Sequence, residues 1–308
     1  MISILIWSLV FIFSLILLIK SSDFFTDASE KIGLWLHISP FIVGVTIVAF
    51  GTSLPELISS SFAVVQGYSE IVAGNVIGSN IANTLLVLGL SVVFGGVITI
   101  KKKNFNFDLA YLIWSSILLF VFVYDGKFTF IEGILSVICL VYYVYHSTKN
   151  NKHGNDKKTK NSLKKTTFPI LVISGVGIFI GAKYTINSVI FFSNLLNIGT
   201  EVISASIVAL GTSLPEVTVS IIAAKKGKGE MALGNVLGSN IFNIFIVMGL
   251  SSFFGTLKIT IRTLTFILPV MLISTLLFLG VCYDKKITKK EGFILILLYI
   301  IFIIKLLI

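Results

Sequence analysis

Two short segments of the chain each place a glutamate directly after a proline, within a long run of apolar residues. The segment at 46–60 reads TIVAFGTSLPELISS and carries Glu56, and the segment at 206–220 reads SIVALGTSLPEVTVS and carries Glu216. An ionisable side chain in the middle of a membrane span is energetically costly, so such a residue indicates a functional site. Because the acid recurs in two equivalent segments, we interpret the pair as ligands of a cation rather than as neutral residues that join helices.

The residues beside each glutamate supply oxygen atoms of the kind that hard cations bind. Proline has no N–H, so Pro55 and Pro215 leave the carbonyls of Gly51 and Gly211 without their usual helical partners. In hydrocarbon, an unpaired carbonyl must face protein, water or an ion. We therefore expect broken helices here and an oxygen shell suited to Ca²⁺ or Na⁺. Besides the glutamates, the ligands predicted from these segments are the carbonyls of Ala49 and Ala209 and the hydroxyls of Thr52, Thr212, Ser53 and Ser213.

A second duplicated motif, GNxxGSNxxN, lies in the apolar runs at 70–90 and 230–250. Its serine and its last asparagine are four residues apart and therefore share one helical face. Their hydroxyl and amide oxygens can complete the ligand shell. The middle asparagines, Asn80 and Asn240, are interpreted instead as donors of hydrogen bonds between helices. The ligands predicted from this motif are Asn83, Asn243, Ser79 and Ser239.

The elements that must position these residues are membrane-spanning helices. Apolar residues make up 56 % of the 308 residues and charged residues 12 %, and the mean hydropathy is +1.00. Soluble domains carry about 25 % charged residues, and a soluble fold cannot bury this much apolar surface. Apolar runs of roughly 20 residues, the length that spans the hydrocarbon, predict ten helices. These runs lie at 2–30, 40–66, 70–96, 107–124, 128–146, 167–196, 200–225, 230–254, 263–281 and 288–308.

The ten predicted spans form two related sets of five. Both motifs recur at an offset of 160 residues, so the chain is an internal duplication. We predict a first five-helix repeat at 1–146, a basic linker at 147–166 and a second five-helix repeat at 167–308. Because five is an odd number, the second repeat must enter the membrane in the opposite sense to the first.

The distribution of basic residues agrees with this inversion. If the N-terminus is outside, eighteen lysines fall in inner loops, and only Lys127, Lys258 and Arg262 fall in outer loops. Positive residues concentrate on the cytoplasmic side of membrane proteins. We therefore predict an all-α integral membrane protein with extracellular termini and a cytoplasmic linker. Because the lysines lie in short clusters between apolar runs, the net charge of +10 does not indicate nucleic-acid binding.

At these motifs the chain resembles the cation/calcium exchanger superfamily, and most closely its compact prokaryotic sodium/calcium exchangers. The resemblance covers nearly the whole chain and depends on the duplicated GTSLPE and GNxxGSN motifs. It implies that Glu56 and Glu216 are the central ligands of transported Ca²⁺ and Na⁺. It also implies that the first and sixth spans slide to alternate access. Many relatives carry an aspartate at one of the positions of Asn83 and Asn243, and the potassium-dependent relatives resemble this aspartate version. Because both are asparagine here, we expect no potassium transport.

We therefore predict a secondary antiporter, not an enzyme, that exchanges Na⁺ for Ca²⁺ across the plasma membrane. The two ions are its substrates, and no cofactor is expected. One Ca²⁺ or two Na⁺ neutralise a pair of carboxylates, so the ions compete for the same oxygens. We expect the protein to work as a monomer in the lipid bilayer. Two alternatives stay open: a Ca²⁺/H⁺ antiporter on the same fold, whose glutamates carry protons, and a passive cation channel, which needs no counter-ion.

Overall fold

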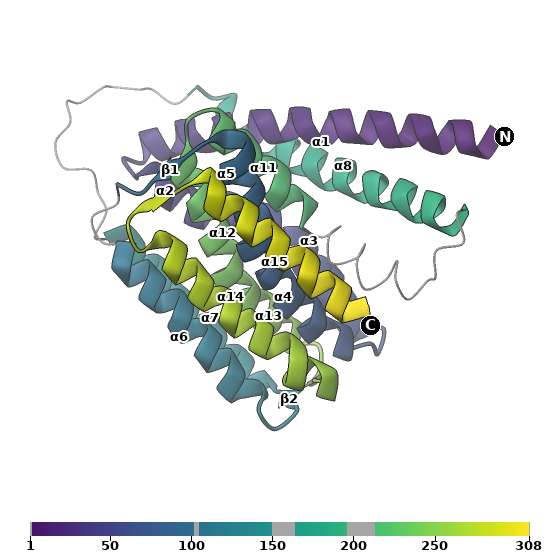
Figure 1. Ribbon diagram of the computed structural model, residues 1–308, viewed down its shortest axis with the longest axis vertical. Helices are drawn as coiled ribbons and strands as arrows, with labels where there is room; N and C mark the ends of the chain where they lie inside the picture. Colours follow the sequence, from purple (N-terminus) through teal and green to yellow (C-terminus); the bar gives the residue numbers. More distant parts are fainter. Residues whose placement is uncertain (1, 102–104, 150–163, 196–212, 308) are drawn as a thin grey trace.

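The computed structural model describes residues 2–101, 105–149, 164–195 and 213–307, and it is mostly helical (Figure 1). By length and composition, eight of the described helices are long and apolar enough to span a membrane. The elements of the first half are α1 (Ile2–Trp35), α2 (Pro40–Val43), the π-helix η1 (Gly44–Val48), α3 (Ala49–Val65), α4 (Glu70–Ala82), the π-helix η2 (Asn83–Val87), α5 (Leu88–Gly95), β1 (Ile98–Thr99), α6 (Phe105–Val123), β2 (Lys127–Phe128) and α7 (Phe130–Lys149).

The second half follows a similar order of elements. They are α8 (Thr167–Leu195), α11 (Leu214–Lys225), α12 (Gly229–Phe242), the π-helix η4 (Asn243–Val247), α13 (Met248–Ser251), β3 (Leu257–Lys258), the π-helix η5 (Thr263–Ile267), α14 (Leu268–Cys282), β4 (Lys286–Ile287) and α15 (Lys289–Leu307). Nine of the ten predicted apolar runs are confirmed as largely helical. Of the remaining run, 200–225, only Ser213 and α11 lie among the described residues.

The expectation of a helix broken at the first glutamate motif is wrong. Helix α3 continues through Pro55, and the irregular turn lies earlier in the chain, in η1. A proline removes the bond to the carbonyl four residues before it, and the neighbouring turns can stay paired. Helix α11 instead begins at Leu214, with Pro215 in its first turn, where no helical bond is lost. Residues 196–212, which include Ala209 and Thr212, lie outside the described part of the chain.

Helices α3, α4, α11 and α12 form the centre of the molecule and pack around η2 and η4. Every residue of α12 from Met231 onward is buried. Glycines bring these helices into backbone contact. A Cβ at Gly44 would overlap the carbonyl of Met231, and a Cβ at Gly234 would overlap the carbonyl of Phe41. Small residues allow such close packing of membrane helices.

Helices α1 and α8 lie side by side across one end of this centre and extend beyond it (Figure 1). Gly181 of α8 faces the backbone of α1, where an added Cβ would lie 2.8 Å from the nitrogen of Leu18. The hydroxyls of Ser14 and Thr185 lie 2.9 Å apart and join the same two helices. The two helices therefore form a tightly joined pair, which we call the α1–α8 pair.

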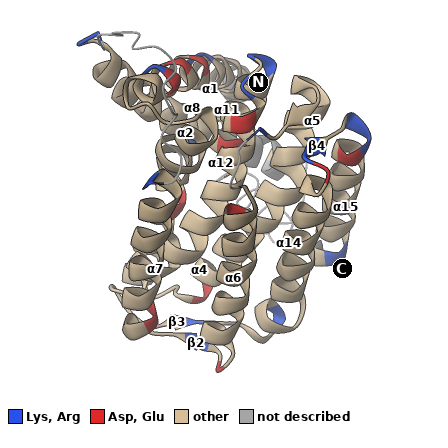
Figure 2. Ribbon diagram, turned by 90° about the vertical axis from the view of Figure 1, so that its left-hand side faces the viewer, with Lys and Arg blue, Asp and Glu red and all other residues tan. Residues whose placement is uncertain are grey.

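Two small antiparallel ribbons connect the halves of the chain. Strand β1 pairs with β4, with Ile98 opposite Ile287, and β2 pairs with β3, with Lys127 opposite Lys258. Figure 2 shows β2 and β3 together at one end of the molecule and β4 toward the other. Positions 98 and 258 are 160 residues apart, and so are their partners, positions 127 and 287. The two ribbons are therefore the same pairing formed twice, at different ends of the molecule.

Candidate cation-binding site

The two glutamates lie in the centre of the molecule, one in each half of the chain. Glu56 is within α3 and 1 % exposed, and Glu216 is in the first turn of α11 and 0 % exposed. The hydroxyl of Ser53 donates a hydrogen bond to Oε1 of Glu216 over 3.2 Å. A residue of the first GTSLPE segment therefore binds the glutamate of the second, and the two segments meet in one site.

Asn83 and Asn243 each occupy the first position of a π-helix, in η2 and η4 respectively. A π-helix, with its i→i+5 hydrogen bonds, is rare in proteins, and the few that occur are frequently found at functional sites. Helix α3 packs against η4, and helix α11 packs against η2. Each helix that carries a glutamate therefore contacts the asparagine-bearing segment of the other half.

Several buried polar atoms of the predicted ligands have no hydrogen-bond partner among the described residues. They are Oε2 of Glu216, the side-chain oxygen and nitrogen of Asn83 and of Asn243, and the hydroxyls of Ser79, Ser213 and Ser239. A buried polar group without a partner costs about 1–3 kcal/mol, and native proteins satisfy nearly all such groups. A hard cation binds oxygen atoms of these types. The unpartnered oxygens therefore fit a cation as their missing partner.

The other predicted ligands of the first segment lie on the buried face of α3. The hydroxyl of Thr52 is 3.4 Å from the carbonyl of Ala49 and 3.2 Å from Oδ1 of Asn235. Their counterparts Ala209 and Thr212 are outside the described residues, so their part of the prediction stays a prediction. The sequence analysis did not assign Asn235 to the site. The sequence signal that could have pointed to Asn235 is that an asparagine, Asn75, stands at the equivalent position 160 residues earlier.

The candidate site combines two acidic side chains with neutral oxygens. Within the described ranges, no three His, Cys, Asp or Glu side chains gather in a way that could hold a metal ion. The predicted ligands of a cation are the carboxylates of Glu56 and Glu216 and otherwise amide, hydroxyl and carbonyl oxygens. Hard cations such as Ca²⁺ accept this mixture, whereas softer metals prefer thiolate or imidazole ligands.

The middle asparagines of the second motif join the central helices, as the sequence analysis proposed. The amide nitrogen of Asn80 donates to the carbonyl of Asn240 over 3.2 Å. The amide nitrogen of Asn240 donates to the hydroxyl of Thr84 over 2.9 Å. These bonds connect α4 and η2 with α12, so they hold together the two segments that carry Asn83 and Asn243.

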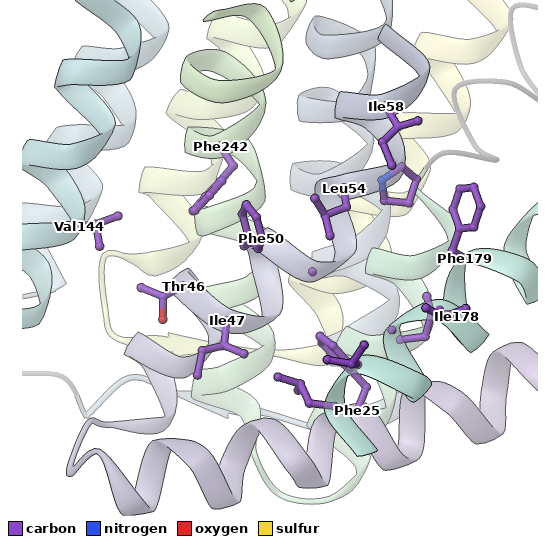
Figure 3. Close-up of a pocket in the computed structure, with 16 residues that line it drawn as sticks. Phe25, Thr46, Ile47, Phe50, Leu54, Ile58, Val144, Ile178, Phe179 and Phe242 are labelled. Carbon is purple, nitrogen blue, oxygen red and sulfur yellow. The ribbon is translucent and has the colours of Figure 1, made fainter. Parts of the chain in front are cut away.

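An apolar cavity of ≈ 680 Å³ lies between the α1–α8 pair and α3 (Figure 3). The ring of Phe25 from α1 lies against Gly51, where an added Cβ would be 2.5 Å from the ring. Leu54 and Ile58 of α3 and Ile178 of α8 form part of the wall. No described carboxylate lines the cavity, so it offers a cation no charged ligand. It is distinct from the candidate cation site.

Known proteins resemble the chain over almost its whole length. The family model described as sodium/calcium exchanger protein matches residues 6–149 and 166–307. The sodium/calcium exchanger MaX1 of Methanosarcina acetivorans is 35 % identical, over 96 % of this chain and 97 % of its own. The sodium/potassium/calcium exchanger 4 of Homo sapiens is 34 % identical, over 42 % of this chain and 21 % of its own.

The fold also matches solved structures of the sodium-calcium exchanger NCX_Mj. A structure of NCX_Mj soaked with zero Na⁺ and Ca²⁺ gives a TM-score of 0.86 at 33 % identity, with 98 % of each chain covered. Both glutamate segments lie within the residues that the family model matches. The chain therefore belongs to the sodium/calcium exchanger protein family, which is a family of membrane transporters.

Proposed function

We propose that the protein is a secondary antiporter that exchanges Na⁺ for Ca²⁺ by alternating access, with the ions competing for one site on Glu56 and Glu216. The observation that carries the proposal is the hydrogen bond from Ser53 to Glu216, which joins the two halves at buried carboxylates. The unpartnered oxygens around it supply the ligands that a dehydrated cation needs. The family of the chain supports Na⁺ and Ca²⁺ as the two substrates.

Charge balance gives the mechanism of coupling. The two carboxylates carry a charge of −2 when ionised, and either one Ca²⁺ or two Na⁺ neutralise it. A further Na⁺ would use only neutral oxygens, such as the hydroxyl of Thr52. An uncompensated charge in the interior of a membrane protein is costly, so the protein changes its open side only with the pair neutralised. Because Ca²⁺ and Na⁺ exclude each other from the same oxygens, movement of one requires countermovement of the other.

The architecture that we propose consists of two inverted repeats, 1–146 and 167–308, joined by a cytoplasmic linker at 147–166. The two β-ribbons support the inversion because equivalent pairings form at different ends of the molecule. The lysine distribution supports an orientation with both termini outside the plasma membrane. The α1–α8 pair is the element that slides across the central helices, and the protein works as a monomer. Because Asn83 and Asn243 are both amides, potassium is not transported.

The test is transport in liposomes that contain the purified protein. Vesicles loaded with Na⁺ are diluted into Na⁺-free buffer, and uptake of labelled Ca²⁺ is followed. We expect uptake that requires internal Na⁺, does not need a pH gradient, and is lost in the Glu56→Gln and Glu216→Gln variants. Glu132→Gln is a matched control, because Glu132 accepts a hydrogen bond from the backbone nitrogen of Thr129 at the start of α7.

Two results would overturn the proposed exchange. Uptake driven by a pH gradient in K⁺-loaded vesicles would identify a Ca²⁺/H⁺ antiporter. Uptake that needs no counter-ion on the far side would identify a channel. In either case, loss of uptake in both glutamine variants but not in Glu132→Gln would still assign the ion pathway to the paired glutamates.

A further inference from the structure

Asn235 is a buried residue of α12 that links the candidate site to a third helix. Its side chain is 0 % exposed. Its Oδ1 accepts a hydrogen bond from the hydroxyl of Thr52 in α3, over 3.2 Å. Its Nδ2 donates a hydrogen bond to the hydroxyl of Ser220 in α11, over 2.8 Å. One amide therefore connects α3, α12 and α11 at the level of the first GTSLPE segment.

The amide of Asn235 lies with its NH₂ group toward Ser220 and its carbonyl oxygen toward Thr52. An asparagine side chain has an NH₂ group that donates and a carbonyl oxygen that accepts. Because the NH₂ group is used by Ser220, the carbonyl oxygen is the atom presented to Thr52. In this orientation the Thr52 hydroxyl can donate its hydrogen to Oδ1 of Asn235, which is nearer to it at 3.2 Å than the carbonyl of Ala49 at 3.4 Å. A hydroxyl has one hydrogen and two lone pairs, so this arrangement leaves both lone pairs of Thr52 free to bind a cation.

The reversed amide would have the opposite effect. Its NH₂ group would donate to Thr52, occupy a lone pair of the hydroxyl and bring partial positive charge beside the cation. We propose that Asn235 is a positioning residue that fixes the Thr52 hydroxyl as a ligand for Na⁺, and that Ser220 fixes Asn235. This inference rests on the proposed exchange of Na⁺ for Ca²⁺ and adds two residues to its machinery, neither of which needs to touch an ion.

The first half of the chain contains the same amide-to-serine bond. Nδ2 of Asn75 donates to the hydroxyl of Ser60 over 3.3 Å, and these residues precede Asn235 and Ser220 by 160 positions each. The bond connects α4 with α3, as its counterpart connects α12 with α11. A pairing that recurs in both halves is a built feature of the fold rather than an accident of one side chain.

The charge balance predicts which ion depends on this hydroxyl. Ca²⁺ is held chiefly by the two carboxylates, whose opposite charge dominates its binding. A Na⁺ beyond the two that neutralise the carboxylates has only neutral ligands, so each correctly oriented oxygen matters more to it. Disorienting the Thr52 hydroxyl should therefore weaken the apparent affinity for Na⁺ more than the apparent affinity for Ca²⁺.

The experiment measures half-saturating Na⁺ and Ca²⁺ concentrations for transport in liposomes with Asn235→Ala, Ser220→Ala, Thr52→Ala and the double variant Thr52→Ala/Asn235→Ala. We expect Asn235→Ala to raise half-saturating Na⁺ about fivefold, the equivalent of one hydrogen bond. Half-saturating Ca²⁺ should change by less than about twofold, because its main ligands are unchanged. In the Thr52→Ala background, Asn235→Ala should cause no further change in Na⁺ affinity.

Thr275→Val is the control for loss of an interhelical bond, because its hydroxyl lies 3.3 Å from that of Ser116 between α14 and α6. Both ion affinities should stay unchanged in this variant. The inference is wrong if Asn235→Ala leaves the apparent affinity for Na⁺ unchanged or weakens the apparent affinities for Na⁺ and Ca²⁺ equally. It is also wrong if Asn235→Ala adds its full effect to that of Thr52→Ala. If Asn235→Ala does not fold, Ser220→Ala carries the test: a raised half-saturating Na⁺ supports the inference, and an unchanged one overturns it. A wild-type protein without Na⁺-driven uptake would refute the proposed exchange itself.

Discussion

The central helices and the α1–α8 pair are both closely packed, but they are packed on different partners. In the centre, Gly44 and Gly234 bring η1 and α12 into backbone contact, and buried polar groups lie between the helices. In the α1–α8 pair, Gly181 lies against Leu18, so the backbones of these two helices are in contact. Toward α3, the pair meets an apolar cavity of ≈ 680 Å³. The centre is thus built to hold polar ligands in place, and the pair is a joined unit that meets α3 around an apolar cavity, with Phe25 against Gly51.

The largest effect is expected at the close contact of the central helices. In Gly234→Ala, the new Cβ would overlap the carbonyl of Phe41, and backbone cannot move aside as a side chain can. Overpacking costs typically about 1–3 kcal/mol, so we expect a lower unfolding temperature and little transport. The unfolding temperature is measured by heating samples of the purified protein and monitoring the remaining folded protein by size-exclusion chromatography.

Gly280→Ala is the matched control for this variant. A Cβ at Gly280, in α14, would meet no heavy atom of the described residues within 4 Å. Its unfolding temperature should equal that of the wild type. If Gly234→Ala and Gly280→Ala were equally stable, the close backbone contact would not be what holds the centre together.

A smaller effect is expected where the two halves meet at the site. Ser53→Ala removes the hydrogen bond to Oε1 of Glu216. A hydrogen bond to a charged group is worth about 1.5–3 kcal/mol, so apparent affinities for Na⁺ and Ca²⁺ should both fall at least about tenfold. Half-saturating concentrations in liposomes measure this effect, with Ser59→Ala as the control. Among the described residues, the Ser59 hydroxyl donates to the carbonyl of Glu56 in its own helix, and a tenfold effect there would contradict the interpretation.

The smallest effect is expected at the ion pairs that attach α1 to the centre. Lys226 lies 2.7 Å from Asp23 and 2.8 Å from Asp27, and Lys228 lies 2.9 Å from Glu30. These side chains are partly exposed, so each pair is worth less than about 1 kcal/mol. Lys228→Gln should lower the unfolding temperature slightly at low salt and not at high salt, since salt screens exposed charges. A difference that persisted at high salt would mean that the lysine stabilises the protein through packing rather than charge.

Much of the fold follows from the sequence because apolar run length and internal repetition are local signals. The paired glutamates and the asparagines of the second motif were predicted on these grounds, and the structure places them on packed central helices. The π-helices could not be predicted, because one extra residue in a turn depends on the packing of neighbouring helices. The continuity of α3 through Pro55 could not be predicted for the same reason: packing by neighbouring helices keeps the surrounding turns helical despite one missing N–H. The role of Asn235 depends on two partners from other helices, and no pattern within α12 reveals them.

The most direct test of the account is equilibrium binding of labelled Ca²⁺ to the purified protein at increasing Na⁺ concentration. We predict that Na⁺ displaces Ca²⁺ with a dependence steeper than one-to-one, because at least two Na⁺ replace one Ca²⁺ at the paired glutamates. Glu56→Gln and Glu216→Gln should each abolish the displaceable Ca²⁺, whereas Glu132→Gln should not. Ca²⁺ binding that is indifferent to Na⁺, or that survives in both glutamine variants, would contradict a shared site on Glu56 and Glu216.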